Sequence, residues 1–134
     1  MRKFRTLIIG ISLIFSLNAL AGYTQPAVVV VDIDGMTASG DMWSARTAND
    51  DVSVIGCGIK KFEGGFSFGF CQATDANDVG YACFTEDPFL LDAIHASSSY
   101  SYLRFDWNAD DECTRIDASN NSFYLPYVTT RGSN

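Results

Sequence analysis

The feature that most limits the fold of this chain is its set of four cysteines, Cys57, Cys71, Cys83 and Cys113. In a small domain that reaches an oxidising compartment, an even number of cysteines predicts disulfides, and four cysteines make two. Zinc binding is the alternative, but zinc ligands usually come in pairs two to four residues apart. The spacings here are 14, 12 and 30 residues, so we predict two structural disulfides.

The start of the chain predicts export. Three of the first five residues are basic, an apolar run follows from Leu7 to Leu17, and the small residues of Ala19-Leu20-Ala21 come next. This order is typical of a cleavable signal peptide, and the run is shorter than the roughly 20 residues of a membrane-spanning helix. We therefore expect a signal peptide at residues 1–21, a single disulfide-stapled domain at 22–134, and no membrane anchor after cleavage.

Charge limits the partners of the exported domain. Without the signal peptide, six Lys and Arg face sixteen Asp and Glu, which is a formal charge near −10. Nucleic acids and anionic membranes bind clustered Lys and Arg, and the only basic pair of the domain is Lys60-Lys61. We expect no nucleic-acid partner and a location in the periplasm or outside the cell. The composition sets no oligomeric state.

Short alternating segments predict a mainly β fold. Six or seven short strands with turns between them indicate an antiparallel sandwich or a barrel-like sheet. These strands are drawn from Ala27–Ile33, Met42–Thr47, Val52–Phe62, Phe66–Cys71, Tyr81–Phe84, Tyr100–Trp107, Cys113–Ser119 and Phe123–Val128.

One short helix interrupts the strands. Asp87 is a favourable N-cap, and Pro88 is suited to the first helical position. The apolar residues that follow have helical spacing, and Ser97-Ser98-Ser99 ends the pattern. A helix between strands keeps an α+β fold as the alternative.

Two of the predicted strands form a hairpin with consistent patterning. If residues 52–62 fold back on residues 66–71 about Gly64, Phe62 lies opposite Phe66 and Cys57 lies opposite Cys71. Side chains two residues apart in a strand share a face. One face of the hairpin then carries Val52, Val54, Phe62, Phe66, Phe68 and Phe70, and the other carries Cys57, Ile59 and Cys71.

The same geometry leaves two disulfide pairings open. The hairpin about Gly64 favours Cys57–Cys71 with Cys83–Cys113. A turn about Asn77 would equally place Cys71 opposite Cys83, which leaves Cys57 to pair with Cys113. We slightly prefer the first pairing. Each disulfide closing a loop of this size stabilises the fold by roughly 3 kcal/mol.

An acidic segment near the C-terminus is the best metal candidate. Its residues occupy positions 1, 3, 5, 7 and 12 of a calcium-loop template, and they are Asp106, Asn108, Asp110, Glu112 and Asp117. The sixth position of the template requires glycine but holds Asp111, and the flanking segments are predicted strands. An acidic turn is the simpler interpretation, so we expect no cofactor, with calcium as the exception.

Aromatic residues provide the candidate binding surface. Tyr100 and Tyr102 lie on one side of their predicted strand, opposite Leu103, Phe105 and Trp107. If the second set faces the core, the two tyrosines form an exposed strip for a glycan or a protein, or they cover the edge of the core.

A third aromatic residue adds to this candidate. Trp43 lies three residues before Arg46 in a predicted strand, and we include both in the binding surface. A lone arginine in so acidic a protein is most often the anchor of a buried or half-buried ion pair.

No catalytic motif stands out, so we expect a non-enzymatic binding module for a protein or a glycan. The alternatives are a small hydrolase that uses carboxylates such as Asp32, Asp34 or Asp106, and a calcium-stabilised structural module. A hydrolase of this type needs two carboxylates facing each other in a cleft.

Most of the domain, from about Gly40 to Pro126, resembles a group of small exported bacterial proteins of unassigned activity. The segments that carry the resemblance are Met42-Trp43-Ser44-Ala45-Arg46, Ile55-Gly56-Cys57, Cys71, Cys83, Ser101-Tyr102-Leu103-Arg104-Phe105-Asp106-Trp107 and Cys113-Thr114. The resemblance implies a shared disulfide framework and a periplasmic or secreted location. It implies no substrate.

Overall fold

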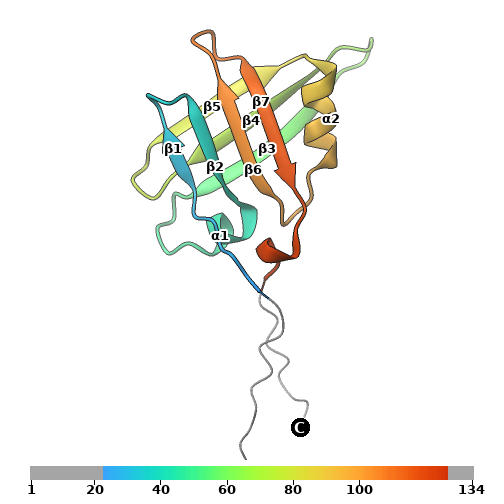
Figure 1. The fold of residues 1–134 in the computed structure, drawn as a ribbon. Coiled ribbons are helices and arrows are strands. Elements are labelled where there is room, and N and C mark those ends of the chain that lie inside the picture. The colour runs from blue at the N-terminus through green and yellow to red at the C-terminus, as the bar shows by residue number, and fades with distance from the viewer. Residues whose placement is uncertain (1–22, 127–134) are drawn as a thin grey trace, which may run out of the picture.

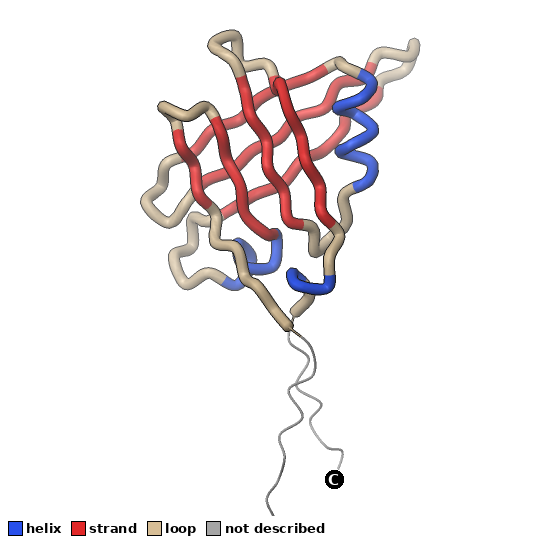
Figure 2. The backbone as a smooth tube through the Cα atoms, viewed as in Figure 1, coloured by secondary structure: helices blue, strands red, loops and turns tan. Residues whose placement is uncertain are grey.

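The computed structural model describes residues 23–126, which form two antiparallel β-sheets packed face to face (Figure 1). The four-stranded sheet has the order β1-β2-β6-β7, with strands at Val30–Asp32, Thr37–Asp41, Tyr102–Trp107 and Cys113–Ser119. The three-stranded sheet has the order β3-β4-β5, with strands at Val54–Lys61, Ser67–Thr74 and Gly80–Thr85. The strands of the two sheets cross at a steep angle (Figure 2). The predicted mainly β fold is confirmed, in its sandwich form.

The two ends of the described segment meet at one end of the sandwich. The backbone N–H of Gln25 donates a hydrogen bond to the carbonyl oxygen of Phe123 at 3.0 Å. The predicted signal peptide, residues 1–21, lies outside the described residues. Between residues 23 and 126, no helix is long and apolar enough to cross a membrane.

Strand β6 supplies the centre of the core. Leu103, Phe105 and Trp107 are buried, and the residues between them point to the outer face of their sheet. This is the period-two pattern of a strand with one covered face. The buried apolar side chains that join them include Val31, Ala38, Ile55, Ala73, Ile94 and Ile116.

Two disulfides reinforce the sandwich, as predicted. Cys57–Cys71 links β3 to β4, and Cys83–Cys113 links β5 in one sheet to β7 in the other. This is the pairing that we preferred. Cys71 and Cys83 are completely buried, so the cysteine face of the three-stranded sheet is its inner face. The disulfides fit an oxidising compartment.

Helix α2, at Pro88–Ala96, begins and ends as predicted, with Asp87 as its N-cap. It packs beside the edge strand β7 and against the inner face of the three-stranded sheet (Figure 1). The close approach requires a glycine: a Cβ atom on Gly69 would lie 2.6 Å from Cδ1 of Ile94 and 2.8 Å from Cδ2 of Leu91.

The predicted strand at Met42–Thr47 is wrong, because this segment is helix α1. The cause is Asp41, the last residue of β2, which immediately precedes this segment and is only 1% exposed. Its carboxylate accepts hydrogen bonds from the backbone N–H of Ser44 at 2.7 Å and from the Ser44 hydroxyl at 2.6 Å. It also accepts one from the backbone N–H of Ala27 at 2.6 Å. An Asp at this position caps the first turn of a helix.

The predicted strand at Phe123–Val128 is wrong where the structure describes it. Residues Ser122–Tyr124 form a 3-10 helix, and residues 127 and 128 lie outside the described range. In this 3-10 helix the rings of the consecutive residues Phe123 and Tyr124 contact different aromatic residues. Phe123 meets Tyr23 edge to face at 5.6 Å between centroids, and Tyr124 stacks on Tyr102 at 5.4 Å.

Asp41→Ala should lower the free energy of unfolding by about 2–4 kcal/mol, because it removes a helix cap and leaves two backbone donors without their acceptor. Asp87→Ala is the matched control: its exposed carboxylate caps only α2, and its loss should cost about 1 kcal/mol. Urea unfolding followed by circular dichroism measures both. Equal losses would show that Asp41 acts as an ordinary helix cap.

Candidate binding surface

The outer face of the three-stranded sheet is aromatic. We define the phenylalanine surface as the five rings on this face and its hairpin: Phe62, Phe66, Phe68, Phe70 and Phe84. Strand register explains their assembly, since Phe70 pairs with Phe84 across β4 and β5 and the N–H of Phe62 donates to the carbonyl of Phe66 at 2.8 Å. The predicted hairpin register is confirmed, with Cys57 opposite Cys71.

Four rings of the phenylalanine surface lie next to one another, and three of these four are more than half exposed. Phe62 and Phe66 stack with centroids 5.7 Å apart, and Phe68 lies 6.1 Å from both. Phe84 continues the series at 6.2 Å from Phe68. Phe62 and Phe66 are each 52% exposed, and Phe84 is 51% exposed. A contiguous apolar patch of this kind typically marks an interaction site.

Glycine and lysine shape one side of this surface. The ring of Phe70 lies over Gly58, where a Cβ atom would come within 2.9 Å of its Cζ atom. The ammonium nitrogen of Lys60 sits over the same ring, 6.0 Å from its centroid. The distance is at the limit of a cation–π contact.

A groove extends from the phenylalanine surface to the first turn of α2. Its volume is about 1030 Å³. The apolar lining residues are Phe66, Phe68, Phe84, Phe89 and Leu90, and three acids, Glu86, Asp87 and Glu112, border it. Phe89 is 84% exposed at the start of α2 and extends the apolar lining beyond the phenylalanine surface.

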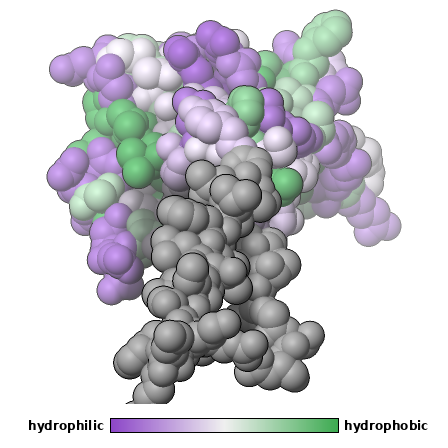
Figure 3. Space-filling model, turned by 60° about the horizontal axis from the view of Figure 1, so that its bottom comes forward, coloured by the Kyte–Doolittle hydropathy of each residue, from purple (hydrophilic) through white to green (hydrophobic). Residues whose placement is uncertain are grey.

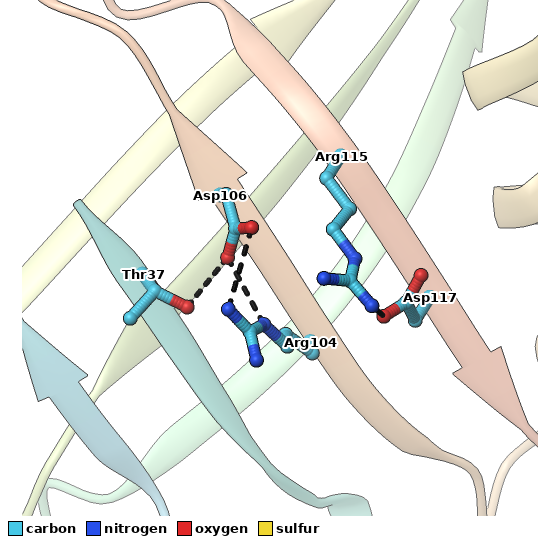
Figure 4. Close-up of polar contacts among 5 residues, drawn as sticks. All are labelled: Thr37, Arg104, Asp106, Arg115 and Asp117. Atoms are coloured by element: carbon cyan, nitrogen blue, oxygen red, sulfur yellow. Dashed lines mark hydrogen bonds and ion pairs between the residues drawn. The ribbon is translucent and has the colours of Figure 1, made fainter. Parts of the chain in front are cut away.

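The outer face of the four-stranded sheet has the opposite chemistry. Arginine and aspartate alternate on β6 and β7, where Arg104 pairs with Asp117 and Asp106 pairs with Arg115 across the strands (Figure 4). Arg104 Nε donates to Asp106 at 3.1 Å, and Arg115 donates to Asp117 at 2.5 Å. The Thr37 hydroxyl donates to Asp106 at 2.5 Å. These charged groups satisfy one another.

Partial burial raises the pKa of Asp106, but the hydrogen bonds from Thr37 and Arg104 and the charges of Arg104 and Arg115 together outweigh it. The net effect lowers the pKa of Asp106 below its usual value. A general acid in a carboxylate hydrolase needs a raised pKa instead. Asp32 accepts a hydrogen bond from the N–H of Gly35 at 2.9 Å in the β1–β2 turn, where its role is structural. Asp34 is exposed in the same turn.

The predicted calcium ligands are not brought together. The Oδ1 atom of Asn108 accepts hydrogen bonds from the N–H groups of Asp110 and Glu112, each at 3.0 Å, so the turn is closed by its own contacts. Asp106 and Asp117 are engaged with arginines on the sheet. Among residues 23–126, no three His, Cys, Asp or Glu side chains are grouped to hold a metal ion.

The predicted aromatic binding residues separate into two places. Trp43 and Tyr100 are exposed and meet with centroids 6.1 Å apart, while Tyr102 stacks on Tyr124 instead. Arg46 is exposed on α1 and forms no ion pair within the described chain, so it is not a buried anchor. Figure 3 views the end of the molecule near α1, where hydrophilic residues cover most of the visible surface outside the grey atoms.

No protein-family model matches the chain, and neither curated proteins nor solved structures give a match. The phenylalanine surface is therefore the main functional candidate on structural grounds alone. The sequence patterning placed four of its rings on one face of a hairpin but did not identify that face as exposed. The signal for exposure was the position of the cysteines. A disulfide that joins two sheets must lie between them, so the phenylalanines on the opposite side of the hairpin must face outward.

Asp106→Asn should change how stability depends on pH. The folded chain holds the Asp106 carboxyl in its charged form more strongly than the unfolded chain does. This stabilisation is present above the unfolded-chain pKa of about 4 and is lost as the pH falls below it. We expect the variant to be less stable near neutrality and to lose less stability on acidification, measured by urea unfolding across this range. The exposed turn variant Asp34→Asn is the control, and parallel pH curves for wild type and Asp106→Asn would contradict the prediction.

Proposed function

We propose that this protein is a non-enzymatic exported module that binds a protein partner through the phenylalanine surface. The observation that carries the proposal is the contrast between the two outer faces. One face has paired arginines and aspartates, whereas the other exposes neighbouring phenylalanine rings, which have no hydrogen-bonding groups of their own. Covering such rings releases about 25 cal/mol for each Å² of apolar area removed from water.

The chemistry of the surface favours a protein over a glycan. Phenylalanine has no donor or acceptor for sugar hydroxyl groups, which must keep hydrogen bonds when they are buried. Aromatic side chains are enriched at the centres of protein interfaces, where they contribute most of the binding energy. The exported location remains part of the proposal, with the two disulfides as its support.

Glycan binding is the second candidate, at Trp43 and Tyr100. Their rings are exposed, lie 6.1 Å apart and carry an indole N–H and a phenolic hydroxyl. Arg46 lies one turn along α1 from Trp43 and adds a donor to the same side. This site is smaller than the phenylalanine surface, so we rank it second.

Site-specific photo-crosslinking in the cells that export the protein tests the leading proposal. Benzoylphenylalanine replaces Phe66 or Phe89 in two variants and Val30 in a third. Val30 is 53% exposed on the outer face of the other sheet, which makes it a control of matched exposure. We expect a discrete polypeptide adduct from the first two positions and none from Val30. Absence of adducts at Phe66 and Phe89, or the same adducts from all three positions, would overturn the proposal.

A further inference from the structure

The groove beside the phenylalanine surface has an uncompensated negative border. The described residues contain two arginine–aspartate ion pairs, Arg104–Asp106 and Arg115–Asp117, and Asp92 lies 4.0 Å from His95. None of these contacts involves the acids of the groove. Glu86 has neither a hydrogen-bond nor an ion-pair partner for its carboxylate in residues 23–126. Glu112 accepts one hydrogen bond, from the Asn108 amide at 2.9 Å, and Asp87 caps α2.

Unpaired carboxylates beside an apolar wall attract a cation more strongly than they would in open water, because the wall keeps water away. The faces of the phenylalanine rings carry partial negative charge and act in the same direction. The ammonium of Lys60 over the Phe70 ring shows a cationic side chain held on this same surface. Charge complementarity therefore indicates a basic ligand at the acidic border.

The two borders of the surface differ in charge, which gives the ligand a direction. Lys60 pairs with Phe68 across β3 and β4, and Gly69 pairs with Thr85 across β4 and β5. Lys60 therefore lies on β3 at one side of the rings, and Glu86 follows β5 on the other side. Two strand spacings separate these edges by roughly 10 Å, which an extended chain spans in about three residues.

We propose that the groove binds an extended polypeptide segment of the partner, in which a basic side chain faces Glu86 and Glu112 and adjacent apolar side chains cover the phenylalanine rings. The inference rests on the proposed function and adds the chemistry of the partner. Lys60 repels a second basic residue at the far end, so the basic side chain lies at one end of the apolar stretch.

Selection of random displayed peptides on the mature, disulfide-bonded protein tests this inference. We expect the enriched sequences to place Lys or Arg beside aromatic or aliphatic residues. A synthetic peptide from this set is then titrated by fluorescence anisotropy against the wild type and two double variants. Glu86→Lys with Glu112→Lys should weaken binding by about tenfold or more at low salt. Asp34→Lys with Asp51→Lys adds the same charge at exposed positions outside the groove lining, and it should leave binding within about twofold.

A peptide with the opposite charge completes the test, because the expected result is a gain of binding and not a loss. Replacing its basic residue by Glu should restore affinity for the variant carrying Glu86→Lys and Glu112→Lys above that for the wild type. Two results together would overturn this inference and leave the proposed function standing: the selected peptides show no preference for basic residues, and they no longer bind a variant carrying Phe84→Ser and Phe89→Ser. Peptides insensitive to that variant would overturn both. Binding to phosphatidylcholine–phosphatidylglycerol vesicles without peptide binding would also overturn both, in favour of a lipid surface.

Discussion

The disulfide Cys83–Cys113 joins the two sheets, and the orientation of the three-stranded sheet depends on it. A bond between sheets must lie in the space between them, so Cys83 points inward. Residues directly opposite each other in a sheet share a face, and Cys83 is in register with Cys71, which is in register with Cys57. All three cysteines therefore lie on the inner face of the three-stranded sheet. Side chains alternate along each strand, so the phenylalanines between these cysteines are placed outside.

The inner face that results is made of small side chains. Cys71 and Ala73 of β4 belong to the same core as the large residues of β6, and Gly69 of β4 lets the apolar side chains of α2 approach the sheet. Bulk is therefore supplied by one sheet and one helix, and the phenylalanines are not needed to fill the core. Cross-strand contacts between exposed rings add only about 0.2–1 kcal/mol per pair. A role in binding accounts for the aromatic outer face better than fold stability does.

The sequence predicted correctly those elements whose formation depends on interactions between residues close together in the chain. The N-cap and the following proline placed α2 correctly, and strand β7 has the bounds that its patterning indicated. Strand β2 was not predicted, because its residues Thr37–Asp41 are small and lack a periodic apolar pattern. It is a strand because β1 and β6 pair with it on both sides. The segment after it resembled a strand, but the buried carboxylate of Asp41 caps a helix there.

By itself, the sequence determined the disulfide-bonded β architecture, the hairpin register and the separation of cysteines from phenylalanines, because alternation and turn residues act over a few positions. Only the tertiary structure decided which of those two faces is covered, since that depends on the cysteine 30 residues away in the other sheet. It also decided that Glu86 and Glu112, distant in sequence, border one groove with Phe84 and Phe89. The binding surface combines strand ends, a helix start and a turn, and no local pattern encodes their meeting in space.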